Sequence, residues 1–157
     1  MRLGGVAVAL AIAVSFVFPW LAELEVRRAA RIWPNDRAAA FRALDHAHRL
    51  NPVSPRADLL AGAIASRVDD PRRMAGAFED AVRRSPNDWY AHLELALAYD
   101  ALGKRRLALG ELAVSKQLNP GEQAIRSVRR EMLGGRHVNR NQIDRLFVER
   151  VRSRVGP

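Results

Sequence analysis

The strongest constraint on this chain is a helix-stopping dipeptide that returns at a fixed interval. Asn51-Pro52, Ser85-Pro86 and Asn119-Pro120 each end a helix-like apolar stretch, and successive prolines lie 34 residues apart. A fixed period of roughly 20–50 residues marks a repeat array, and about 34 residues is typical of a helix-turn-helix unit. The sequence therefore predicts an all-α fold in which short helical hairpins stack side by side.

The second helix of each unit carries one stripe of small and large residues. Its central residue is large in every unit, and a proline follows eight positions later. Residues spaced by three and four lie on one face of a helix, so they can be buried together. The three matching stripes are Ala40, Leu44 and Ala47, then Met74, Phe78 and Ala81, then Ala108, Leu112 and Ser115.

The first helices repeat less fully, although Gly62 and Ala96 are small residues at the same interval of 34. Together with the stripe and the proline, this order of small, aromatic and turn residues resembles the tetratricopeptide repeat over about residues 34–121. The resemblance implies a protein-interaction scaffold built of stacked helix pairs. It is carried by Gly62, Phe78, Ala81 and Pro86 in one unit and by Tyr99, Gly103, Ala108 and Pro120 in the next.

The helix boundaries divide the array into a half repeat at 34–54 and two full repeats at 55–88 and 89–121. Asp58 and His92 stand where the repeat family usually has tryptophan. The half repeat lacks a recognisable first helix, so residues 23–33 are expected to be its partner. Beyond Pro120 the period fades. Residues 122–157 are predicted to form a basic C-terminal pair of capping helices, at about 122–133 and 141–154.

The amino-terminal stretch is apolar, and residues 3–21 contain no charge. At a rise of 1.5 Å per residue, about 20 apolar residues cross the hydrocarbon core of a membrane. Trp20 lies at the end of the stretch, where an amphipathic ring favours the headgroup layer. A cleaved signal peptide is the alternative, but no small-x-small cleavage site follows. We therefore expect a transmembrane anchor at 1–22 that continues as a juxtamembrane helix at 23–33.

The arginines that follow this stretch predict which side of the membrane the repeats occupy. Arg27, Arg28, Arg31 and Arg37 lie close behind it, and the tendency of positive residues to stay inside then places the repeats in the cytoplasm. The opposite orientation remains open because only two residues precede the apolar stretch. The expected location is a single-pass membrane protein.

The net charge of +9 raises nucleic acid and anionic membranes as partners. Nine arginines lie between Arg126 and Arg154, a region whose single aromatic ring is Phe147. Nucleic acid is disfavoured because unpaired bases stack on aromatic side chains. The alternative is that the C-terminal arginines contact anionic lipid, where each basic residue adds about 1 kcal/mol.

No pattern of residues points to catalysis or to a cofactor. The chain has no cysteine, and His46 and His48 are two residues apart on a helix, so they point in different directions and cannot hold one metal ion. No serine stands in a nucleophile elbow, and no phosphate-binding glycine loop follows a strand. We expect no enzyme activity, no metal and no cofactor.

The expected binding surface is the concave groove that the first helices line in arrays of this type. Its residues are mainly apolar, with one base and one acid, which suits an amphipathic helix or an extended apolar peptide. The lysine and asparagine clamp with which such repeats hold chaperone C-termini is replaced by leucine and alanine. The equal alternative is that these leucines pack against the cap or a neighbouring helix. The predicted groove residues are Arg56, Leu59, Leu60, Ala63, Tyr90, Leu93, Glu94 and Leu97.

A second resemblance concerns the layout of the chain. A last membrane helix, an arginine-rich connection and the stretches AAFRALDHAHRLNPVSP and WYAHLELALA resemble the C-terminal tail of bacterial O-antigen ligase-like membrane proteins. The multi-span body that carries that family's chemistry is absent from this sequence. The resemblance therefore implies an accessory or stand-alone relative of the cell-envelope polysaccharide machinery, and not the transferase.

Overall fold

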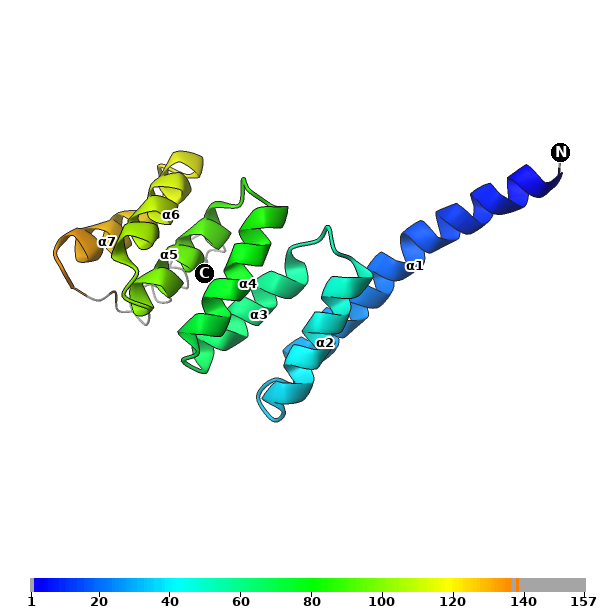
Figure 1. Ribbon diagram of the computed structural model, residues 1–157, viewed down its shortest axis with the longest axis horizontal. Helices are drawn as coiled ribbons and strands as arrows, with labels where there is room; N and C mark the ends of the chain where they lie inside the picture. The colour runs from blue at the N-terminus through cyan, green and yellow to red at the C-terminus, as the bar shows by residue number, and fades with distance from the viewer. Residues whose placement is uncertain (1, 137, 139–157) are drawn as a thin grey trace, which may run out of the picture.

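The computed structural model of the 157-residue chain describes residues 2–136 and 138, with side chains from Val17 onward. All regular structure in these residues is helical (Figure 1). The helices are α1 (Arg2–Ile32), α2 (Arg37–Leu50), α3 (Arg56–Arg67), α4 (Pro71–Arg84), α5 (Trp89–Ala101), α6 (Arg105–Leu118) and α7 (Gln123–Leu133).

The helices pack as consecutive hairpins, α1 with α2, α3 with α4 and α5 with α6. Helix α4 also packs on α5 and α2 on α3, so the hairpins form one continuous row, and α7 contacts α6 at its far end (Figure 1). The amino-terminal part of α1 projects away from the row at the other end. The predicted all-α hairpin array is confirmed.

The core is the stripe of the second helices. All nine stripe residues are at most 2% exposed, including Leu44, Phe78 and Leu112 at the centres. Each large centre packs against a first helix that comes close because it carries a small residue there. A Cβ built on Gly62 would lie only 2.5 Å from the Phe78 ring, so this position admits no side chain at the present spacing.

The turns within the hairpins use one left-handed residue. Gly103 has φ +71° and Asp69, at the matching place, has φ +56°. Glycine adopts this conformation without a steric penalty, and aspartate tolerates it better than most residues. The amide that follows, that of Lys104, donates to the Tyr99 carbonyl at 2.8 Å and closes the end of α5. The interval of 34 therefore reflects a repeated turn geometry as well as a repeated core.

The first hairpin differs from the others by one residue. Four residues, 33–36, join α1 to α2, whereas three join the later pairs, at 68–70 and 102–104. The extra residue shifts α1 by one position, so that Ala29 is 0% exposed while Arg28, which the 34-residue interval aligns with Gly62, points to solvent. The hairpin of α1 and α2 thus has a complete first helix, which a comparison at constant offset does not find.

The prediction of a membrane anchor is wrong. Among the helices of residues 2–136, as far as the structure describes them, none is long and apolar enough to cross a membrane. The reason is that α1 does not end with the apolar stretch. It continues to Ile32 through Glu23, Glu25 and Arg27, and it packs along α2. The anchor at 1–22, the fold class that included it and the single-pass location with cytoplasmic repeats are therefore corrected.

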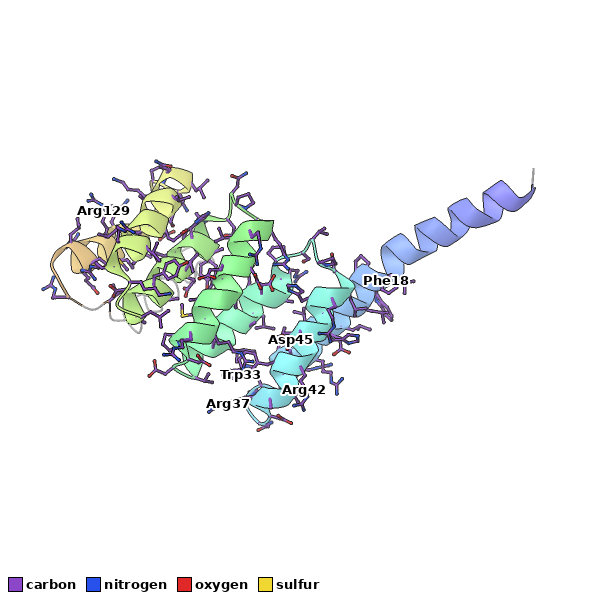
Figure 2. The ribbon with its side chains drawn as sticks, viewed as in Figure 1. Phe18, Trp33, Arg37, Arg42, Asp45 and Arg129 are labelled. Carbon is purple, nitrogen blue, oxygen red and sulfur yellow. The ribbon has the colours of Figure 1, made fainter. Side chains whose placement is uncertain are left out.

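The side chains that are described on the projecting part of α1 are exposed. Figure 2 shows Phe18 where the helix leaves the row of hairpins, and Trp33 and Arg37 at the opposite end, by the turn into α2. Phe18 is 44% exposed and Trp20 is 61% exposed. The first predicted capping helix corresponds to α7, and the second, at 141–154, lies outside the described residues.

Candidate interaction surface

The predicted groove residues fall into two sets, one on each of two first helices. The first set, which we call the α3 arc, is accessible to solvent. Arg56 is exposed and Leu59, Leu60 and Ala63 are half-buried. The Arg56 guanidinium lies 3.1 Å from the Glu23 carboxylate of α1, so an ion pair borders the apolar part of this arc. The α3 arc is a surface that a second molecule can reach.

The second set, the α5 arc, consists of Tyr90, Leu93, Glu94 and Leu97. Leu93 is 0%, Leu97 4% and Glu94 8% exposed, and only Tyr90 is half-buried. The Tyr90 ring stands edge-on to Trp89 with ring centres 6.1 Å apart. The structure therefore does not present the eight residues as one open groove, because the α3 arc is open and the α5 arc is covered. Whether these residues bind a partner stays a prediction.

A buried polar network joins three helices at the position that usually holds tryptophan. The Asp58 side chain of α3 is only 7% exposed, and its Oδ1 lies 2.9 Å from Nδ1 of His48 on α2. Its Oδ2 faces the Arg84 guanidinium of α4 at 3.2 Å, as an ion pair without hydrogen-bond geometry. Arg84 also donates to the Pro52 carbonyl at 2.7 Å. The network connects consecutive repeats where the apolar ring is missing.

The contacts determine how the His48 ring is protonated. Its Nε2 lies 2.8 Å from Nη2 of Arg84, and a guanidinium can only donate. Nε2 must therefore accept, and Nδ1 must carry the proton that is donated to Asp58. His48 acts as a neutral bridge between an acid and a base that also face each other directly.

His92 occupies the matching position on α5 and makes a different set of contacts. Its Nδ1 lies 2.7 Å from a Glu111 carboxylate oxygen of α6, and its Nε2 lies 3.0 Å from the Pro86 carbonyl. Both partners are acceptors, so both contacts are hydrogen bonds only when the ring is doubly protonated. The His92 side chain is 7% exposed, and it links the loop before α5 to α6.

The network raises the question of a metal site, because His48, Asp58 and Asp80 offer ligand atoms within 4.8 Å of one another. The Arg84 guanidinium already supplies the positive charge at this place, touching both His48 and Asp58. A divalent cation would have to displace it against its ion pair. The arrangement is better explained as a structural link than as a ligand set. Sequence reasoning missed it because two of the residues are 26 or more positions from the third, and no short-range motif connects them.

An open cleft of about 620 Å³ lies over the same network, between α2 and α4. On its wall the Arg73 guanidinium stacks 3.9 Å from the centre of the Phe41 ring. Two of the acids that line the cleft are paired, Asp58 with Arg84 and Asp80 with Arg83. The cleft therefore offers few polar groups that could specify a small ligand.

One titratable group is clearly perturbed. Burial and the hydrogen bond from the Tyr99 hydroxyl to the Glu79 carboxylate, 2.9 Å long, raise the pKa of Tyr99 to about 12. The bond joins α5 to α4, and the nearby negative charges of Glu79 and Glu111 act in the same direction. A phenol whose pKa is raised stays protonated at neutral pH, so this group stabilises the array and offers no general base.

The row of hairpins and the face of its first helices define a tetratricopeptide-like repeat protein, a class that typically serves as a non-enzymatic interaction scaffold. Among solved structures the chain is similar to the first tetratricopeptide domain of Spaghetti (RPAP3), bound to the HSP90 peptide SRMEEVD, with a TM-score of 0.68. The match covers 74% of this chain and 94% of that chain at 14% identity, which shows the fold alone.

No protein-family profile and no curated protein sequence matches the chain. The comparisons do not show the resemblance to O-antigen ligase-like proteins, which stays a prediction. Contact of the C-terminal arginines with anionic lipid also stays a prediction, and from residue 139 on it concerns residues outside the described part of the chain.

Proposed function

We propose that this chain is a protein-interaction module that holds an amphipathic or extended apolar peptide against the α3 arc. The observation that carries the proposal is the partial exposure of Leu59, Leu60 and Ala63 on one helix face, beside the ion pair of Arg56 with Glu23. Apolar side chains on an exposed face can anchor a helix whose own apolar residues recur at intervals of three and four.

The chemistry of the α3 arc favours an apolar ligand over an acidic C-terminus. The RPAP3 domain was solved with the peptide SRMEEVD, which is rich in acids. In this chain the residues at the clamp positions of the repeat family are Leu59, Ala63, Leu93 and Leu97, and none of them can bind a carboxylate. Arg56 is the one base of the α3 arc, and it already faces Glu23 at 3.1 Å.

The proposal is tested with a charge placed at Ala63 and a matched charge elsewhere. Ala63→Glu puts a carboxylate in the middle of the α3 arc, whereas Ala113→Glu puts one on the exposed surface of α6. Both substitutions replace alanine by another good helix former, so both proteins are expected to keep their circular dichroism spectrum.

The measurement is the fluorescence anisotropy of a labelled synthetic amphipathic helix, with its scrambled sequence and the peptide SRMEEVD as comparisons. We expect the amphipathic helix to bind the unmodified chain and Ala113→Glu alike, and to bind Ala63→Glu about tenfold more weakly, which corresponds to about 1.4 kcal/mol. Equal binding to all three proteins would show that the α3 arc is not the site. Preference for SRMEEVD would show that the ligand chemistry is wrong.

A further inference from the structure

The two arcs occupy the same register in consecutive repeats and yet differ in exposure. Leu59 and Ala63 of α3 are half-buried, while Leu93 and Leu97, 34 residues later, are 0% and 4% exposed. Equivalent positions in a repeat array normally have equivalent neighbours. Something other than the repeat therefore covers the α5 arc.

The helices that flank α5 do not account for this burial. His92 and Tyr99 of α5 reach Glu111 on α6 and Glu79 on α4. At about 100° per residue, Leu93 and Leu97 lie about 100° and 140° around the helix from His92, on the side turned away from that α6 contact. Among the described helices, the main contacts of α5 are with α4 and α6 alone. The covered arc is thus a third side of the helix.

The end of the described chain runs close to this side. The Val138 amide donates to Asp100 Oδ2 at 3.4 Å, and Val138 packs against the core beside the carboxyl end of α5. Helix α5 has 13 residues and is therefore about 20 Å long. Residues 139–157 follow Val138, and in helical form they would extend about 28 Å, enough to run back along the whole of α5.

The sequence of this segment suits the α5 arc chemically. Ile143, Leu146, Phe147 and Val151 recur at helical intervals and would form one apolar face, while arginines occupy the rest. The α5 arc offers two leucines and one carboxylate, that of Glu94, which is engaged in a polar contact although it is 8% exposed. Apolar residues flanked by arginine match an apolar surface that contains a buried acid.

We propose that residues 139–157 occupy the α5 arc as an internal ligand, so that an incoming peptide reaches only the α3 arc until this segment is displaced. The placement of the segment stands on the burial of Leu93 and Leu97, on the position of Val138 and on charge complementarity. The part that concerns an incoming peptide rests on the proposed function. The segment would then regulate how much of the groove a partner can use.

The placement is tested with a spin label, since the chain has no cysteine of its own. Arg150→Cys in the full chain carries a nitroxide, and leucine methyl signals are recorded by NMR. We expect the methyl signals of Leu93 and Leu97 to lose most of their intensity and those of Leu107, on the exposed side of α6, to be retained. Adding Phe147→Asp to the labelled chain should restore the signals, whereas adding Val148→Asp, off the predicted apolar face, should not.

Each alternative has its own result. Retained Leu93 and Leu97 signals, or loss at Leu59 alone, would overturn the placement. Loss that appears between a labelled copy and an unlabelled, methyl-enriched copy would assign the α5 arc to a second chain and likewise overturn it. In the anisotropy assay, Phe147→Asp should bind the amphipathic helix about tenfold more tightly, because the competing segment is released. Unchanged affinity would overturn the regulatory part. If no peptide binds any variant, the proposed function fails while the NMR result still decides the placement.

Discussion

Gly62 tests whether the packing of the hairpins is understood. In the structure a Cβ at this position would lie 2.5, 2.7 and 2.8 Å from three carbon atoms of the Phe78 ring. Phe78 is 0% exposed, so the ring has no free space into which it can turn. Gly62→Ala must therefore push α3 and α4 apart or force the ring out of its preferred position, and we expect it to destabilise the array.

The magnitude follows from two opposing contributions. Overpacking a well-packed core costs typically 1–3 kcal/mol, about what is expected of a methyl group forced against a ring. Replacing glycine by alanine inside a helix contributes about 1 kcal/mol in the opposite direction. Gly76→Ala in α4 is the matched control, because a Cβ at Gly76 meets no atom within 4 Å. The helix contribution cancels between the variants, so Gly62→Ala should be about 1–3 kcal/mol less stable than Gly76→Ala.

The assay is urea unfolding followed by circular dichroism, with both variants and the unmodified chain in parallel. A rescue variant is available within the repeat itself, since Ala96 faces the place where Leu112 replaces the phenylalanine. The double variant Gly62→Ala, Phe78→Leu should regain most of the loss because it copies that pair. If Gly62→Ala proves as stable as Gly76→Ala, the close approach of α3 to the Phe78 ring does not limit the packing.

Two further predictions concern the polar contacts. Arg84→Met should cost about 3 kcal/mol in urea unfolding because it leaves the buried Asp58 carboxylate without its charge partner. The neighbouring Arg83→Met, whose side chain is 69% exposed, should stay within about 0.5 kcal/mol, and equal losses would contradict the network. Because the pKa of Tyr99 is raised to about 12, its contribution to stability should be complete below pH 10.0 and vanish as pH rises through 12. A spectrophotometric titration should show one late phenol that Glu79→Gln moves to lower pH, and an unmoved titration would contradict the bond.

Much of the fold could be predicted because its information is local and repeated. The stripes centred on Leu44, Phe78 and Leu112, with a proline eight residues after each centre, specify where the second helices lie and where they end. The capping residues are equally local, and Asp70 accepts from the Arg73 amide at 3.0 Å. Such signals depend on neighbours within one turn of helix, so they can be read without knowing the tertiary structure.

Two errors came from treating a local pattern as complete. The apolar stretch at 3–21 satisfied a length criterion for a membrane span, but the described part of α1 is continuous with a helix that packs in the array. The constant offset of 34 missed the first helix of the first hairpin, because one additional residue in the turn at 33–36 rotates α1 by about 100°. A single insertion is small in the sequence and decisive for which face is buried.

The candidate surface was predictable by register and not by exposure. The register correctly placed Leu59 and Leu93 at equivalent positions on first helices, but it could not show that one is half-buried and the other fully buried. Likewise, Asp58 and His92 were noted as departures from the repeat, while their partners His48, Arg84 and Glu111 were not. Burial and pairing depend on segments that are distant in the chain.

By itself, the sequence determined that this chain forms stacked helical hairpins, because helix periodicity, caps and turn residues act over a few positions and repeat every 34 residues. Only the tertiary structure decided that α1 belongs to the array, that Asp58 is held between His48 and Arg84, and that the α3 arc is open while the α5 arc is covered. These outcomes depend on which faces meet, and they change with a one-residue shift that leaves the local pattern of each helix intact.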